Sequence, residues 1–202
     1  MVALVVGLIV VLGGGGAAAY FYTTAHRDQG RAATGDTLPD QCAVSEQTLQ
    51  RARTTNPNAL MSKQTENFTS CDWLQTKGRD GEGNRALNAR IDEYRVDKGS
   101  RDTPQGLAEA GFNAEHTNFV NARQGGEVLI EPLPNFGDQA EIAVELTDSA
   151  YTMVHVLVRQ GGRTLNLDYS GWDIGVFSPK RPDVEEMKAI AHTAAGELLA
   201  KF

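Results

Sequence analysis

The sequence predicts an α+β domain, an antiparallel β-sheet with helices packed on it, preceded by one N-terminal transmembrane helix. Three observations support this prediction. Residues 151–169 hold two strand-like segments around a Gln-Gly-Gly centre, residues 182–202 repeat apolar side chains at helical spacing, and residues 1–22 carry no charge. The predicted organisation is a membrane segment at 1–22, a flexible linker at 23–37 and an extracytoplasmic domain at 38–202.

The N-terminal segment, residues 1–22, has the length and composition of a transmembrane helix. About 20 apolar residues cross a bilayer as a helix, and the aromatic cluster Tyr20–Tyr22 suits the interfacial end of such a span. A buried core helix is one alternative. The other is a signal peptide cleaved near Ala19, because Ala17–Ala19 forms a small-residue cleavage pattern, and cleavage would leave a secreted protein.

The charged residues that flank this segment do not give a straightforward prediction of its orientation in the membrane. Arg27 and Arg31, the nearest basic residues, follow the apolar run, and the positive-inside rule would then place the domain in the cytoplasm. We expect instead that a basic segment precedes Met1 in the natural chain. The protein is then a single-pass membrane protein, integral through residues 2–22, with residues 23–202 extracytoplasmic.

The N-terminal half of the domain predicts one helix, two strands and the start of a second helix. Ser45–Thr54 begins with a capping serine and is rich in helix formers. Alternating polarity predicts strands at Ser70–Thr76 and Arg85–Val96, joined by a turn at 77–84. Thr103, followed directly by a proline, predicts the start of the second helix.

The C-terminal half predicts a sheet that ends in a hairpin. Strands at 128–130 and 140–146 precede the hairpin strands Tyr151–Arg159 and Arg163–Tyr169. The Gly-Gly pair at the hairpin centre supplies the positive φ angles that tight turns need. The first hairpin strand is apolar on both faces, which predicts a central strand covered on both sides.

Residues 182–202 predict an amphipathic helix that packs on this sheet. Acidic residues at its start suit the positive end of the helix dipole. Its apolar positions recur at three- and four-residue steps, at Val184, Met187, Ala191, Ala194 and Leu198.

The two cysteines, Cys42 and Cys71, have several interpretations. A structural zinc site uses four ligands in close pairs, and the sequence has no C-x-x-C or H-x-x-x-H pattern. A catalytic thiol or two buried free thiols remain open. After a membrane-spanning segment, two cysteines most simply form one disulfide, worth about 3–4 kcal/mol of stability in the chain-entropy model.

The four histidines are scattered along the sequence, with no motif for catalysis, a metal or a cofactor around them. His155 lies within a strand and is expected to face Asp168 across the hairpin. No serine in a nucleophile elbow completes a triad. We therefore expect no cofactor, no metal site and no catalytic residues. A hydrolase that acts through His155 or His116 is the remaining enzymatic alternative.

Residues 169–182, YSGWDIGVFSPKRP, are the candidate binding segment. They connect the hairpin to the last helix and carry Trp172, Ile174, Val176 and Phe177. The candidate contact residues are Tyr169, Trp172, Ile174 and Phe177. A loop with this composition is typical of contacts with a partner or an apolar ligand. The alternative is that these side chains cover the core beneath the helix.

The order of several motifs resembles a known family. A cysteine before a short helix is followed by CDW on a strand, PLPNFGDQA, VHVLVRQGGRTLNLDYSGW and an Ala-rich last helix. This order is similar to the actinobacterial envelope proteins of the domain of unknown function 3558 family, over residues 38–202. The resemblance implies a Mog1/PsbP-like fold, export and usually an anchor, and it brings no catalytic residues. The chain differs in lacking a lipobox before Cys42, and in Gln139 and Gly162, where the family often has Glu and Asn.

The overall charge narrows the expected partners. The formal net charge is −7. Nucleic acids and anionic lipid headgroups both bind clusters of Lys and Arg, so an acidic net charge argues against both as partners. We expect a non-enzymatic, membrane-anchored extracytoplasmic domain that binds an envelope protein, a peptide or a lipid-like ligand. An accessory or sensory subunit of another membrane protein is the alternative.

Overall fold

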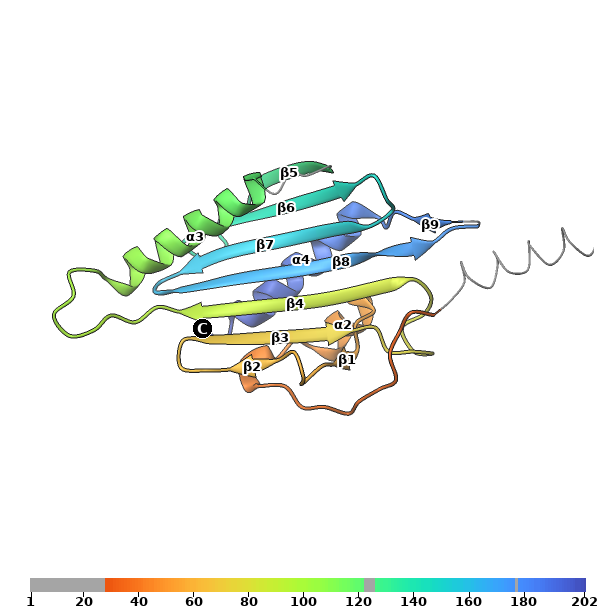
Figure 1. Cartoon of the computed structure of the whole chain (residues 1–202), viewed down its shortest axis with the longest axis horizontal. Coiled ribbons are helices and arrows are strands. Elements are labelled where there is room, and N and C mark those ends of the chain that lie inside the picture. Colours follow the sequence, from red (N-terminus) through yellow and green to blue (C-terminus); the bar gives the residue numbers. More distant parts are fainter. Residues whose placement is uncertain (1–27, 122–125, 177) are drawn as a thin grey trace, which may run out of the picture.

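The computed structural model describes residues 28–121, 126–176 and 178–202 (Figure 1). Along these ranges the helices and strands follow in the order η1 (Asp40–Cys42), α2 (Glu46–Ala52), β1 (Asn56–Pro57), β2 (Lys63–Gln64), β3 (Phe68–Leu74), β4 (Asn84–Glu93), α3 (Pro104–Asn121), β5 (Gly126–Pro132), β6 (Gln139–Thr147), β7 (Thr152–Gln160), β8 (Arg163–Ile174), β9 (Pro179–Lys180) and α4 (Val184–Leu199).

The strands form one antiparallel sheet with the order β1-β3-β4-β8-β7-β6-β5, in which β2 also pairs with β3 and β9 with β8. Its central junction is the pairing of β4 with β8, which runs from Asn84 opposite Trp172 to Glu93 opposite Arg163. This long-range pairing joins the N-terminal β3–β4 hairpin to the β5–β8 meander. An antiparallel sheet with packed helices confirms the predicted α+β class.

Helices cover both faces of the sheet, but unequally. Figure 1 shows α3 on the near face, over the β6–β7 side, and α4 on the far face. Alternation along β7 explains why both helices pack there: Val154 and Val156 belong to the core beneath α4, whereas Leu157 is buried on the opposite face. The prediction of a central strand covered on both sides is confirmed.

The main hydrophobic core lies between α4 and the sheet. The side chain of Asp183 caps the helix by accepting a 3.1 Å hydrogen bond from the Glu186 backbone N–H. Small side chains on the buried stripe let the helix approach the strands closely. The buried residues of α4 are Met187, Ile190, Ala191, Ala194, Ala195 and Leu198.

Strand β8 is longer than the sequence predicts. It continues past Tyr169 to Ile174, because Gly171 and Trp172 still pair with β4, so the first part of the predicted connecting loop is strand. Gly171 has a φ of 152°, and a Cβ there would collide with the carbonyl oxygen of Asn84. The glycine therefore permits the close strand pairing that extends β8. By contrast, β4 ends at Glu93, three residues before the predicted Val96.

The predicted flexible linker needs a correction from Asp28 onward. Asp28 and Arg31 form parallel bridges with Gly83 and Thr76. The Thr34 backbone N–H and hydroxyl both donate to the side chain of Asn56, at 3.1 and 3.2 Å. The chain is held along the domain because these bonds satisfy backbone groups that a free linker would leave to water.

The predicted membrane segment, residues 1–22, lies outside the described residues, as do linker residues 23–27. Within the part of the chain that the structure describes, no helix is long and apolar enough to cross a membrane.

Candidate binding surfaces

Cys42 and Cys71 form a disulfide, which confirms the predicted pairing. Their Cα atoms are 5.5 Å apart and both side chains are buried in the main core. The bond links the segment that precedes α2 to strand β3. Such bonds form and persist in oxidising compartments, so the disulfide is consistent with an extracytoplasmic domain.

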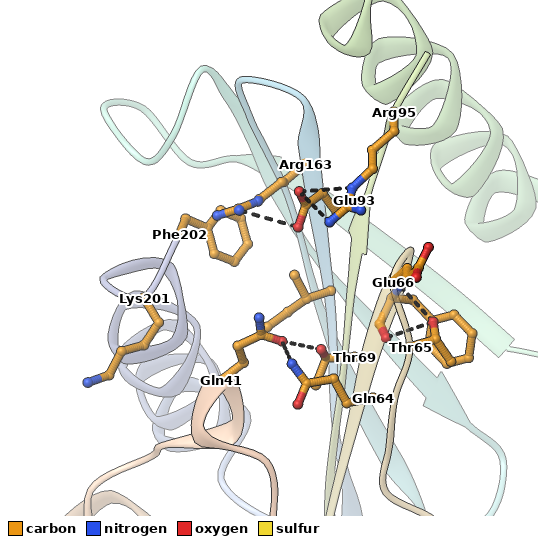
Figure 2. A pocket seen from close by; sticks show the side chains of 12 residues that line it. Gln41, Gln64, Thr65, Glu66, Thr69, Glu93, Arg95, Arg163, Lys201 and Phe202 are labelled. Carbon is orange, nitrogen blue, oxygen red and sulfur yellow. Dashed lines mark hydrogen bonds and ion pairs between the residues drawn. The ribbon is translucent and has the colours of Figure 1, made fainter. Parts of the chain in front are cut away.

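A small pocket of about 110 Å³ lies beside this disulfide, at the end of the sheet where α4 finishes. Figure 2 shows Gln41, Gln64 and Thr69 turned toward one another and Glu93 placed with Arg95 and Arg163, whereas Lys201 points away from them. Gln41 accepts hydrogen bonds from Thr69 and Gln64, and Glu93 pairs with Arg95 and Arg163, each at 3.3 Å. Because these groups satisfy one another, we interpret this pocket as structural support for the disulfide region.

The residues of the predicted binding loop do not share one role. Tyr169 is buried in the core, where its hydroxyl donates a 2.9 Å hydrogen bond to the Ala52 carbonyl oxygen. Burial raises the pKa of this phenol, so it stays protonated. Trp172 and Ile174 are half-buried at the end of β8. Phe177 lies outside the described residues.

His155 and His116 each face carboxylates. His155 Nδ1 lies 2.6 Å from Asp168 Oδ1, as predicted, and its ring stacks against Phe119 with the centroids 4.5 Å apart. His116 Nδ1 lies 2.9 Å from both carboxylate oxygens of Glu141. Among the described residues, no hydroxyl or thiol hydrogen bonds to either ring.

Polar side chains line up across the face of the sheet that α3 partly covers, from β3 to β7. The register places Asp72 of β3 opposite Asn88 of β4, Asn88 opposite Asp168 of β8, and Asp168 opposite His155 of β7. Residues opposite one another in paired strands point to the same face. One polar row therefore crosses four strands, and Figure 1 shows no helix over β3 and β4 on this side.

This row borders a hollow of about 230 Å³, which we call the polar hollow. The side chains of Asn88 and Asn166 make no hydrogen bond with any other described residue, and Asn166 Oδ1 is shielded from solvent. Native structures pair most such groups. The residues that line the polar hollow are Met61, Ser70, Cys71, Asp72, Asn88, Ala89, Arg90, Asn166 and Asp168.

The charged side chains around the polar hollow are carboxylates, apart from one arginine that a carboxylate neutralises. Asp92 holds the Arg90 guanidinium through three contacts of 2.7 to 3.0 Å, and Arg90 lies over the Phe68 ring at 4.3 Å. Burial raises the pKa of Asp72, although a 2.6 Å hydrogen bond from Asn58 opposes the shift. The hollow therefore offers amide donors and acceptors and carboxylate acceptors, and it repels anions.

A second surface, at the other end of β8, has the opposite charge. We call it the basic groove, a space of about 400 Å³ with five cationic and three carboxylate side chains around it. The floor is apolar, with Met187 and Ile190 of α4 beside Tyr169. The cationic side chains are Arg51, Arg53, Arg85, Lys180 and Arg181, and the carboxylates are Asp173, Asp183 and Glu186.

Asp173 organises the basic groove. Its Oδ1 accepts hydrogen bonds from Arg53 Nη1 at 2.9 Å and from Arg85 Nη2 at 2.5 Å, so two guanidiniums share one carboxylate. Arg85 is buried and also donates to the Asn84 and Trp172 carbonyl oxygens. Two guanidiniums paired with one carboxylate leave a net positive charge around Asp173.

The rim of the groove carries cationic side chains that form no ion pair within the part of the chain that the structure describes. The side chains of Arg51 and Lys180 make no hydrogen bond with other described residues. Arg181 donates to a backbone carbonyl, that of Thr147, at 2.8 Å. An anionic group is the ligand chemistry that these three side chains favour.

The fold and these surfaces define a disulfide-bonded α+β domain with two exposed polar sites of opposite charge. The chain matches no family model, and comparisons with curated proteins and with solved structures found no match. The resemblance to the domain of unknown function 3558 family stays a prediction.

The polar hollow was partly visible in the sequence. In β8, Asn166 and Asp168 alternate with buried Leu165 and Leu167, so a polar face could be predicted there. The sequence does not show that Asp72 and Asn88 extend the same row. The basic groove had no sequence signal, because its cations come from three separate segments, at 51–53, 85 and 180–181.

Proposed function

We propose that the protein is a membrane-anchored extracytoplasmic domain that binds a hydroxyl-rich ligand, such as an envelope saccharide, in the polar hollow without chemical conversion. The observation that carries the proposal is the pair of amides, Asn88 and Asn166, that have no protein partner among the described residues. The disulfide and the apolar residues 2–22 support the compartment and the anchor.

The donors and acceptors of the hollow match neighbouring hydroxyl groups. An amide side chain both donates and accepts, and each carboxylate accepts two hydrogen bonds from a diol. Asn88 lies between Asp72 and Asp168 in the register, so these three groups follow a line across adjacent strands. A ring with several hydroxyls can bind along this line.

The surroundings favour a neutral ligand with an apolar face. The carboxylates of Asp72 and Asp168 disfavour an anion, and Arg90 is already neutralised by Asp92. Met61 lines the hollow and is 68% exposed, and Leu60 beside it is 95% exposed. Exposed apolar side chains of this kind can pack against the C–H face of a sugar ring.

A glycan array probed with the full chain in detergent tests the proposal, followed by calorimetric titration of the saccharides retained. Replacing Asn88 or Asn166 with leucine should weaken binding by on the order of tenfold, because each change removes hydrogen bonds worth about 1–2 kcal/mol. Asn113→Leu on the exposed face of α3 is the matched control and should leave the affinity unchanged. Retention of no neutral saccharide, or equal binding by all three variants, contradicts the proposal.

An accessory subunit of another membrane protein is the second candidate. Strand β5 favours it, because within the described residues this edge strand pairs only with β6 and exposes Leu129 by 45%. Such an edge can accept a strand from a partner. Cross-linking through a photoreactive residue at position 129 in the native membrane tests this candidate, and recovery of the uncross-linked chain alone counts against it.

A further inference from the structure

We infer that the basic groove and the adjacent β8–β9 tip rest on the bilayer surface and bind anionic lipid headgroups. This inference rests on the membrane anchor in the proposed function and is separate from the polar hollow. It reverses the expectation from net charge, which argued against anionic lipids.

The course of the chain places the groove next to the anchor. Asp28 forms a bridge with Gly83, and its carboxylate accepts a 2.6 Å hydrogen bond from the Gly78 backbone N–H. Gly83 in turn lies against Arg53 and the Trp172 carbonyl oxygen, so a Cβ there would come within 3.3 Å of Arg53 and 2.7 Å of that oxygen. The first described residue is therefore a neighbour of the groove.

The length of the intervening chain limits how far the groove can lie from the bilayer. Between Tyr22, at the end of the predicted span, and Asp28 the chain has six Cα–Cα steps, which reach at most about 20 Å. Figure 1 shows β9 and the end of β8 at the same end of the domain as the start of the described chain. The C-terminus and the β4–α3 connection lie at the opposite end.

The charge of the groove suits an anionic surface. Five cationic and three carboxylate side chains surround it, although the whole chain has a net charge of −7. The side chains of Arg51 and Lys180 have no hydrogen-bond or ion-pair partner among the described residues, and the Arg181 side chain donates to a backbone carbonyl. Cations near an anionic membrane surface are attracted to it within about a Debye length, and phosphate oxygens match the guanidinium geometry.

The tip of the β8–β9 hairpin adds an apolar element beside these cations. The Gly175 N–H donates a 3.0 Å hydrogen bond to the Ser178 carbonyl oxygen, and Val176 within this turn is 71% exposed. Lys180, two residues beyond the turn, pairs with Asp173 in the β-ladder. An exposed apolar side chain followed by basic residues is typical of elements that lie at a membrane interface.

The experiment places an environment-sensitive fluorophore at the tip. Both cysteines of the chain are in the disulfide, so Val176→Cys supplies the only free thiol for labelling. The full chain is reconstituted into vesicles of phosphatidylcholine, with or without phosphatidylglycerol, that contain lipids brominated near the headgroup. We expect quenching of the label in the anionic vesicles and much less in the neutral ones.

Charge reversal tests the groove itself. Arg51→Glu with Lys180→Glu should shift the equilibrium away from the docked orientation on the order of tenfold in anionic vesicles. The matched control, Lys98→Glu with Arg101→Glu, changes the net charge equally on the exposed connection at the opposite end of the domain and should leave the quenching unchanged. Thermal unfolding monitored by circular dichroism checks that both variants fold.

The outcomes separate the anchor from the docking surface. A chain that does not sediment with vesicles overturns the proposed anchor. A chain that sediments but whose label stays unquenched in both lipids overturns this inference alone, and so does equal quenching in the groove variant. Titration of inorganic phosphate into the detergent-solubilised chain is a further arm. Tight binding there, lost in the groove variant and without quenching in vesicles, would assign the groove to a soluble anion instead.

Discussion

The polar hollow and the basic groove both involve strand β8, yet they are built in different ways. The hollow is a regular product of strand register, because Asp72, Asn88 and Asp168 occupy matching positions on three paired strands. The groove is assembled from the ends of separate elements, around Asp173 at the end of β8. One surface is acidic and amide-rich, and the other is basic.

The comparison shows that the net charge of a chain says little about its individual surfaces. The negative net charge of the chain agrees with the carboxylates of the hollow, whereas the groove has more cationic than carboxylate side chains. Charges act over about a Debye length, so a ligand responds to the local cluster and not to the sum.

Removing the disulfide should weaken both regions together. Cys42 precedes α2, which carries Arg51, and Cys71 lies on β3, which carries Asp72. The double change Cys42→Ser and Cys71→Ser should lower the free energy of unfolding by about 3–4 kcal/mol, because the closed loop constrains the unfolded chain. Urea denaturation of oxidised and reduced wild-type protein provides the control. An unchanged midpoint in both comparisons would contradict this account.

Replacing Asp173 should affect the groove and spare the hollow. Asp173→Asn removes the carboxylate that Arg53 and Arg85 share, and it leaves a buried guanidinium with fewer charged acceptors. We expect a loss of about 1–2 kcal/mol of stability, discounted because Asp173 is partly exposed. Denaturant unfolding measures the loss. Asp148→Asn, on an exposed turn, should have no effect, and an equal loss there would remove the special role of Asp173.

Placing an apolar side chain in the polar hollow should raise the stability of the fold, whereas the Asp173 change lowers it. Asn166→Val removes an unpaired amide from a strand and adds a β-branched residue that favours strands. We expect a gain of about 0.5–1 kcal/mol in the free energy of unfolding, together with loss of the saccharide binding that we propose. A variant that is less stable than wild type would show that the amide supports the fold.

The pH dependence of Asp72 gives the smallest effect. Burial raises its pKa above the ordinary value of 3.8, so the folded state binds this proton more tightly than the unfolded state. Its stability contribution is therefore present at low pH and lost as pH rises through the raised pKa. Asp72→Asn, which mimics the protonated form, should gain stability relative to wild type as pH increases across this window. Carboxyl NMR titration checks the direction, and a pKa at or below 3.8 contradicts it.

Several elements could be predicted because their signals are local. The Gly-Gly hairpin between β7 and β8, the apolar stripe of α4 and the pairing of Cys42 with Cys71 all follow from neighbouring residues or from composition. Strand alternation and helical periodicity are properties of a short segment, so a sequence shows them directly.

The boundaries of strands and of the linker were harder to predict, because pairing with residues that are distant in the sequence determines where they end. Strand β8 extends to Ile174 only because β4 and β9 supply partners there. Residues 28–37 look like a linker by composition, but bridges to Thr76 and Gly83 hold their first part to the domain. No local pattern encodes these partners.

Local patterns in the sequence are enough to predict an α+β domain with an antiparallel sheet, a C-terminal helix, one disulfide and an apolar N-terminal segment. Which polar side chains come into contact depends on the tertiary structure. Arg53 and Asp173 are 120 positions apart in the chain and 2.9 Å apart in the fold. Such long-range contacts depend on the packing of α2 against α4 and on the pairing of β4 with β8, which no single segment specifies. The polar hollow and the basic groove are consequences of topology, whereas the elements that carry them are consequences of local pattern.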